Sequence, residues 1–226
     1  MAALTTKQSV STVYNGAMEK IRNFHLSPEE EALWKGLRTP IAIQDYLETL
    51  PINFEKRGDT HYSPRTVMQK QTAHCIEGAL LAAAILDFHG ERPLLMDFTT
   101  KKKDEDHVVA LYKINGYWGA ISKTNHPILR FRDPIYKTLR ELALSFAHEY
   151  FMFEDGEKTL VSYSRPLNMR RFGTKWITTS EDLFWVDAAL DKNKHYSIVP
   201  EVNRTHLRPA TVFERKAMTQ REWEKK

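Results

Sequence analysis

The chain contains one cysteine, Cys75, and the residues around it favour nucleophilic chemistry. A thiol attacks a carbonyl only as the thiolate, and a free cysteine with a pKa of about 8.5 is mostly protonated at neutral pH. Cys75 lies near the start of the apolar segment 72–86, and a helix beginning there would stabilise the anion through its unpaired amides and its dipole. An imidazolium beside the sulfur would have the same effect, and we expect His107 to supply it. The sequence therefore predicts Cys75 as nucleophile, with His107 as general base and later general acid.

The segments that must position these two residues have different periodicities. Segment 72–86 is apolar on nearly all faces, which predicts a buried central helix that ends before Gly90. Segments 107–114 and 117–121 are short and apolar, and the Asn-Gly pair between them predicts a tight β-hairpin. A nucleophile on a buried helix and a base on an adjacent strand can meet only where the helix packs on the sheet. We therefore expect the site at this junction.

The flanking sequence predicts helices around the sheet. Helix starts are expected at Ser27-Pro28, Thr39-Pro40 and Ser63-Pro64, because each pair combines an N-cap hydroxyl with a proline in the first turn. Further elements are expected as a strand at 128–132, a helix over 136–151, an edge strand at 159–163, and a helix from the Thr178–Glu181 capping box to Leu190. This pattern indicates one α+β domain over residues 1–226, with an N-terminal extension (1–26) and a peripheral C-terminal tail (203–226).

Two motifs resemble those of the transglutaminase-like superfamily, which has a papain-like cysteine fold. The first is Gln71-Thr-Ala-His-Cys75-Ile-Glu-Gly, followed by small and apolar residues as far as the Gly90-Glu-Arg-Pro93 turn. The second is Asp106-His107-Val-Val-Ala-Leu, followed by Asn115-Gly-Tyr-Trp118. The resemblance covers roughly residues 65–134. It implies a buried nucleophile helix on an antiparallel sheet, and thiol chemistry in which a cysteine thioester carries an acyl group taken from a peptide, protein or small amide.

The resemblance also implies a residue that orients the imidazole and a set of donors for the oxyanion. In the family an aspartate usually follows the histidine by about fifteen residues, whereas this chain has Ser122 there; Asn125 and Asp133 are the alternatives, with Asp133 ranked last. A serine or asparagine can fix the imidazole tautomer, but it lacks the negative charge of an aspartate. The Cys75 amide is one expected oxyanion donor. Gln69 lies six residues before the cysteine, which is the spacing of the oxyanion glutamine in papain-like enzymes, and Gln71 is nearby.

The composition limits the other classes of protein to which the chain could belong. The chain has 226 residues, 42% of them hydrophobic, and a net charge of 33 − 29 = +4, which is typical of a globular protein and too small by itself to indicate nucleic-acid binding. The basic residues of the tail alternate with glutamates, so we do not expect a nucleic-acid surface. The longest apolar run, 78–86, is too short to span a bilayer, and residues 1–20 lack the apolar core of a signal peptide. We expect a cytoplasmic protein.

Three other interpretations of these residues are possible. A metal site could use His74, His107 and a carboxylate such as Asp106, but no H-x-x-x-H or H-E-x-x-H spacing occurs, and the thiol chemistry requires no metal or organic cofactor. Cys75 could be a small buried apolar residue, and His107 a strand-edge histidine bonded to a carbonyl. The serine at position 122 also favours a second hypothesis, a transglutaminase-like domain that has lost turnover and serves as a binding or scaffolding module.

Overall fold

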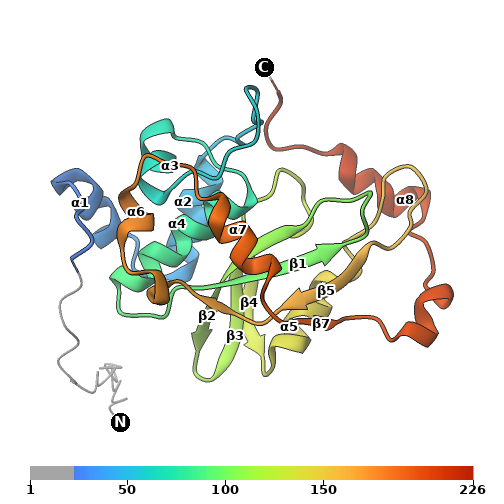
Figure 1. The fold of residues 1–226 in the computed structure, drawn as a ribbon. Helices are drawn as coiled ribbons and strands as arrows, with labels where there is room; N and C mark the ends of the chain where they lie inside the picture. Colours follow the sequence, from blue (N-terminus) through green and yellow to red (C-terminus); the bar gives the residue numbers. More distant parts are fainter. Residues whose placement is uncertain (1–22, 226) are drawn as a thin grey trace, which may run out of the picture.

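The structure is a computed structural model, and it describes residues 23–225. It has the predicted α+β class: a sheet of seven strands in which every pairing is antiparallel, with helices on both faces (Figure 1). The strands are β1 (Leu94–Thr100), β2 (His107–Ile114), β3 (Tyr117–Ile121), β4 (Arg132–Tyr136), β5 (Leu160–Ser164), β6 (Leu167–Asn168) and β7 (His195–Ser197). Their order is β4-β3-β2-β1-β5-β7, and β6 also pairs with β1.

The helices are mostly short and lie around this sheet. The α-helices are α1 (Pro28–Gly36), α2 (Pro40–Thr49), α3 (Pro64–Lys70), α4 (Cys75–Phe88), α5 (Leu139–Phe146), α6 (Lys175–Thr178), α7 (Phe184–Asp191) and α8 (Val212–Arg215). Three 3₁₀ helices are η1 (Met169–Phe172), η2 (Glu201–His206) and η3 (Lys216–Thr219). In the described part of the chain, none of the helices has the length and apolar content that a bilayer crossing requires.

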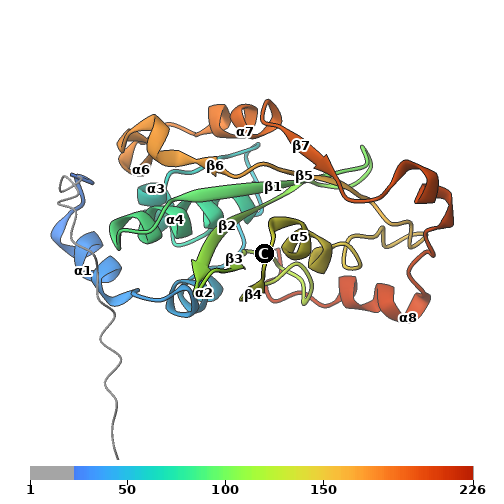
Figure 2. The same cartoon turned by 90° about the horizontal axis from the view of Figure 1, so that it is seen from below.

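The central helix α4 begins at Cys75, which confirms the predicted helix start. Its residues from Ile76 to Asp87 are all buried, because α2 and α3 cover the side that does not contact the sheet. The core on the α4 face contains Val108, Ala110 and Tyr112 of β2. The alternate residues Val109 and Leu111 face α5 on the other side. Both faces of the sheet are therefore buried, and Figure 2 shows α4 and α5 on opposite sides of strands β2 to β4.

The hairpin and the first three helix starts were predicted correctly. Asn115 and Gly116 both have positive φ (51° and 88°), as a tight turn between twisted strands requires, and they join β2 to β3. The side chains of Ser27, Thr39 and Ser63 each accept a hydrogen bond from a first-turn amide of the helix that follows.

Four predictions about the flanking elements were wrong in extent or place. The strand expected at 128–132 is β4, which begins only at Arg132, and the helix expected over 136–151 is shorter, from Leu139 to Phe146. Strand β5 is not an edge strand, because β7 pairs with its outer side. Helix α7 begins at Phe184, after Leu183, so the Thr178–Glu181 pair does not cap it.

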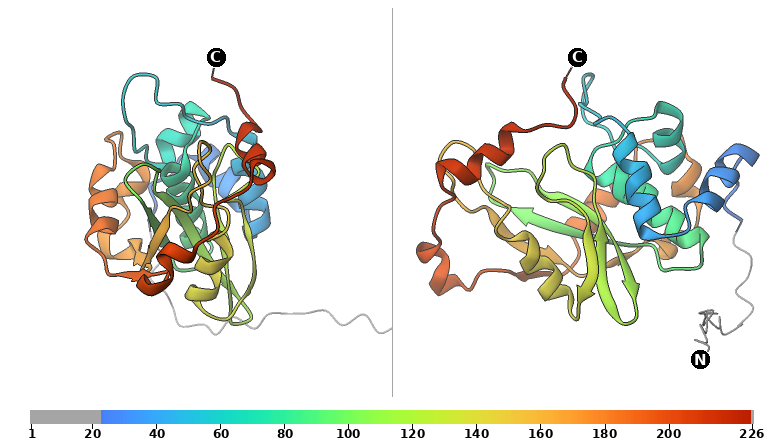
Figure 3. Two further views of the ribbon diagram at one scale, coloured as in Figure 1. Left: turned by 90° about the vertical axis from the view of Figure 1, so that its right-hand side faces the viewer. Right: turned by 180° about the vertical axis from the view of Figure 1, so that it is seen from behind.

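Both predicted extensions contribute to the folded structure. Of the extension 1–26, residues 1–22 lie outside the described residues, and Phe24 packs edge-on against Trp34 and Phe88. The tail that follows β7 is red in Figure 3, where it runs around the outside of the molecule and returns to the loop after α2. Trp223 also fixes the tail to the segment after β3, since its backbone exchanges two hydrogen bonds with the Asn125 side chain, 2.8 and 2.9 Å long.

Gly78 brings α4 close to the segment that follows β3. A Cβ at this position would lie 2.6 Å from the Cβ of Lys123, so the helix can pack against that segment only with glycine here. The Lys123 ammonium is buried and donates a hydrogen bond to the Leu50 carbonyl oxygen (2.5 Å), which ties the same segment to the end of α2. Burial lowers the pKa of Lys123 to about 8. The close packing fixes the position of Ser122 relative to α4.

Candidate active site

Cys75 is the first residue of α4 and lines a cavity of about 350 Å³ beside the start of strand β2. Its side chain is partly exposed, whereas the rest of the helix up to Asp87 is buried. His74, from the residue before the helix, and His107, from the first position of β2, line the same cavity. The structure therefore brings the cysteine and the predicted histidine together at the helix–sheet junction.

Ser122, directly after β3, holds the His107 ring. The Nε2 atom of His107 lies 2.8 Å from the Ser122 hydroxyl oxygen, and that hydroxyl donates its own proton to the Leu129 carbonyl oxygen at 2.5 Å. Because the hydroxyl has only one proton, it accepts from His107, so Nε2 carries the ring proton. This leaves Nδ1 of His107 unprotonated in the neutral ring and able to accept the thiol proton.

Helix α2 fixes the position of Ser122 in turn. The Gln44 side chain is buried and pairs with both backbone groups of Ser122: its oxygen accepts from the amide (3.0 Å), and its NH₂ group donates to the carbonyl (2.9 Å). His107 and Ser122 are themselves almost fully buried, 6% and 2% exposed. The imidazole therefore has one well-determined orientation.

The surroundings of the sulfur favour the thiolate. Burial alone would raise the pKa of Cys75, but hydrogen bonds from His107 and then His74, together with their charges, lower it well below the usual value. The helix N-terminus contributes in the same direction, since its first amides have no acceptor within the helix. Cys75 thus has the low thiol pKa that nucleophilic cysteines require.

His74 is a second imidazole in contact with the thiol. Its Nδ1 lies 3.9 Å from the Cys75 sulfur, and its Nε2 lies 2.8 Å from the Thr60 carbonyl oxygen. Both ring nitrogens therefore face acceptors, which favours the imidazolium. Burial opposes this charge, but Cys75, then the Glu77 carboxylate, and the Thr60 carbonyl raise the pKa of His74 to about 10. At neutral pH His74 is therefore an imidazolium, and it lies beside a thiol whose pKa is lowered.

A buried carboxylate supports His74. Glu77, in the first turn of α4, is completely buried and accepts hydrogen bonds from the side chains of Asn53 and Thr60 and from the amides of Tyr62 and His74, at 2.9–3.1 Å. One of its oxygens lies 3.4 Å from Nε2 of His74, and a Glu55 oxygen lies 3.5 Å from the same atom. A carboxylate thus lies behind His74, whereas the neutral Ser122 lies behind His107.

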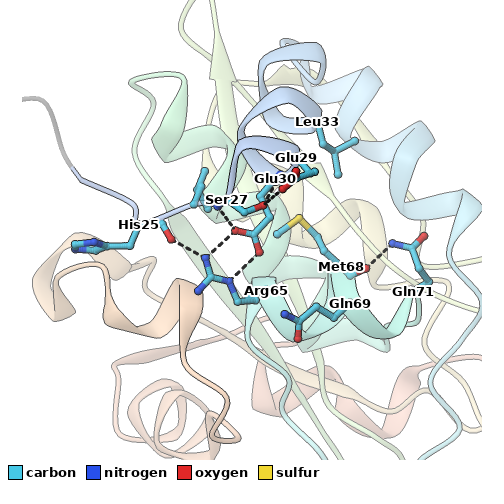
Figure 4. Close-up of a pocket in the computed structure, with 10 residues that line it drawn as sticks. His25, Ser27, Glu29, Glu30, Leu33, Arg65, Met68, Gln69 and Gln71 are labelled. Atoms are coloured by element: carbon cyan, nitrogen blue, oxygen red, sulfur yellow. Dashed lines mark hydrogen bonds and ion pairs between the residues drawn. The ribbon is translucent and has the colours of Figure 1, made fainter.

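The structure does not bring the other candidate residues to His107. Asn125 lines the cavity, but its side-chain amide binds the Trp223 backbone. Asp133 is exposed on β4 and does not line the cavity. Gln69 is exposed on α3 and, with Gln71, lines a different pocket beside α1, where the Glu30–Arg65 ion pair lies (Figure 4). Among the candidates Ser122, Asn125 and Asp133, only Ser122 contacts His107.

Three residues of the site were not predicted in these roles: the sequence indicated His74 only as a possible metal ligand, and it did not indicate Glu77 or Gln44. Glu77 is three residues after His74, which is a capping-box spacing, so a local signal existed for that pair. Gln44 had none. No group of three or more histidine, cysteine or acidic residues between 23 and 225 is arranged to hold a metal ion, and this includes the alternative set of His74, His107 and Asp106.

Comparison with models of known protein families gives no match for this chain, and comparison with curated proteins gives none either. The site must therefore be interpreted from its own geometry.

Ser122→Ala tests the orienting contact. We expect it to slow the reaction of Cys75 with an acylating ester by on the order of 10²-fold, because His107 loses the acceptor that selects its tautomer. Ser122→Thr retains a hydroxyl and should restore much of the rate. Ser164→Ala is the matched control: Ser164 is equally buried and bonds the Asp97 amide, but it does not line the cavity. A Ser122→Ala protein that reacts as fast as wild type would refute the orienting role.

Proposed function

We propose that this chain is a transglutaminase-like thiol enzyme that hydrolyses or transfers the acyl group of an amide through a thioester on Cys75. The observation that carries the proposal is the placement of a low-pKa thiol at the start of a buried helix, beside a histidine whose opposite nitrogen is bound to a serine hydroxyl. This arrangement agrees with the fold and the two motifs that the resemblance implies.

The chemistry follows from the positions of the protons. The Cys75 thiolate attacks the carbonyl carbon, and the oxyanion that develops can be stabilised by amides of the first turn of α4, including that of Cys75. His107, which has taken up the thiol proton at Nδ1, then donates that proton to the leaving amine as the C–N bond breaks, and the thioester remains. Neutral His107 next removes a proton from water or an amine, which attacks the thioester, and the thiolate leaves. His74, held by Glu77, keeps a positive charge beside the sulfur at both stages.

The proposal is tested by labelling the thiol. Since Cys75 is the only cysteine, any alkylation by iodoacetamide reports on it alone. We expect the folded protein to react with a pH midpoint well below the value of about 8.5 that denatured protein should show. A Cys75 that reacts only after denaturation, or that has the same midpoint in both states, would refute the proposal.

A specific observation also favours the second candidate, a binding or scaffolding module without turnover. Ser122 is neutral and gives the His107 imidazolium no counter-charge. Such a module would be acylated once by p-nitrophenyl acetate, with a burst equal to the protein concentration and no further release. The enzyme would continue to release nitrophenolate, and Cys75→Ala would abolish both phases.

A further inference from the structure

Carboxylates surround the opening of the Cys75 cavity. Those that line it are Glu55, Asp104, Glu105, Asp106 and Glu149. Glu149 is paired with Arg132 (2.6 Å), but within residues 23–225 neither a lysine nor an arginine forms an ion pair with the other four. The one lysine among the lining residues is Lys123, and its ammonium is directed to the Leu50 carbonyl. The cavity therefore has an excess of negative charge.

Hydrogen bonds orient three of these four carboxylates, and Glu55 also lies 3.5 Å from the His74 imidazolium. Glu55 accepts from the Thr60 amide (2.8 Å), Asp104 from the Glu105 amide (2.9 Å), and Asp106 from the Thr100 amide (2.7 Å). Glu105 itself is exposed between Asp104 and Asp106. Such carboxylates can accept a further cationic donor, and the bonds that hold them reduce the entropy that binding would otherwise cost.

A buried, unsatisfied hydroxyl belongs to another residue that lines the same cavity. Tyr150 lines the cavity and is only 2% exposed, and its hydroxyl has no hydrogen-bond partner among the described residues. Burial, then the negative charges of Cys75, Asp97, Asp104 and Asp106, raise the pKa of this hydroxyl well above its usual value, so it remains a donor. Leaving a buried donor unpaired is unfavourable, and a bound acceptor would remove this cost.

We infer that the cavity takes an acyl substrate with a cationic group beside the reacting carbonyl, as in a lysine- or arginine-containing peptide, and that Tyr150 donates a hydrogen bond to that substrate. The cation would lie among Asp104, Glu105 and Asp106. The inference rests on the proposed thiol chemistry: the new bond joins the Cys75 sulfur to the acyl carbon, and the bond that breaks is the one from that carbon to the leaving group.

Two matched esters test this inference. Nα-acetyl-lysine p-nitrophenyl ester carries the cation, and Nα-acetyl-norleucine p-nitrophenyl ester has a similar chain without it. Both acylate a thiolate and release nitrophenolate. We expect the lysine ester to acylate Cys75 about tenfold faster at low salt, after correction for the reaction in Cys75→Ala, and the ratio to fall toward one at 1 M salt, where charges are screened beyond about 3 Å.

Variants separate the parts of the inference. Glu105→Gln should lower the lysine-to-norleucine ratio several-fold, whereas Glu181→Gln, an exposed glutamate outside the cavity, should leave it unchanged. Tyr150→Phe should slow acylation by both esters about tenfold without lowering the thermal midpoint, because the hydroxyl has no partner to lose.

The outcomes distinguish this inference from the proposed function. Equal rates for the two esters would overturn the cationic substrate and leave the thiol chemistry intact. A Tyr150→Phe protein that is acylated at the wild-type rate would overturn the role of the hydroxyl. If neither ester acylates Cys75, the proposed function itself fails, and iodoacetamide labelling would then show whether the thiol is accessible at all.

Discussion

Replacing His107 by alanine is expected to return the ionisation of Cys75 toward that of an ordinary thiol, and to do so further than His74→Ala. The hydrogen bond from His107 is the largest influence that lowers the thiol pKa, and the bond from His74 is the next. With His107 absent, the effect of burial on the sulfur is opposed by His74 alone. We expect the midpoint of the alkylation rate to rise by at least about one pH unit, equivalent to about 1.4 kcal/mol, and by more in the double variant.

The rate of acyl transfer should decrease at both low and high pH. As pH falls through the lowered pKa of Cys75, the sulfur takes up a proton and the reaction slows. As pH rises through about 10, His74 loses its proton, so the thiolate loses a neighbouring positive charge. We therefore expect a broad plateau between these limits, with the acid limb well below the pKa of a free thiol.

A histidine that shares the cavity without touching the sulfur provides the control. His126 lines the cavity, but its Nδ1 lies 3.2 Å from the Gln220 carbonyl oxygen, so His126→Ala should leave the midpoint unchanged. The same midpoint for His107→Ala and wild type would contradict the role of His107. A larger shift for His74→Ala than for His107→Ala would instead assign the general base to His74.

The sequence predicted the two elements that carry the thiol and the base because their signals are local. The start of α4 at Cys75, the start of β2 at His107 and the Asn115-Gly116 turn each follow from a few neighbouring residues. Once the hairpin register is set, Ser122 must lie near His107, since Ala110 pairs with Ile121 across the two strands. Counting along the chain made Ser122 a candidate, but it did not distinguish Ser122 from Asn125, and the contact with His107 does.

Contacts between distant segments could not be predicted in this way. Gln69 has the expected spacing from Cys75, but α3 ends at Lys70 and the chain turns at Gln71 with φ of 51°, which leaves Gln69 on the side of α1. Asn125 is engaged by Trp223, 98 residues later. The sequence predicted β5 as an edge strand because its outer neighbour, β7, has only three residues, which are too few to show a periodic pattern.

Removing the carboxylate of Glu77 is expected to cost the most stability of any single change at the site. Glu77→Ala removes an acceptor that four donor groups share, and only the Asn53 amide among them has a second acceptor, the Thr60 hydroxyl. All four lie on or beside the loop that precedes α3 or at the start of α4. Hydrogen bonds to a charged group contribute about 1.5–3 kcal/mol each, and water can replace some of those that are lost. We expect the free energy of unfolding to fall by about 3–5 kcal/mol, measured by urea denaturation followed by tryptophan fluorescence.

Glu77→Gln, combined with the midpoint of Cys75 alkylation, separates the effect of the Glu77 charge from the effect of its packing. The glutamine keeps the size of the side chain but removes the negative charge near His74 and turns an NH₂ group toward other donors. It should lower the pKa of His74 and, through the weaker imidazolium, raise the midpoint of Cys75 alkylation. Glu31→Gln, which removes an exposed glutamate paired with Lys35, should change stability by less than about 0.5 kcal/mol and leave the midpoint in place. If Glu77→Gln is destabilised while the thiol midpoint is unchanged, the carboxylate only holds the loop. If both the stability and the thiol midpoint change, the buried Glu77 carboxylate acts through His74 on the reactivity of the sulfur.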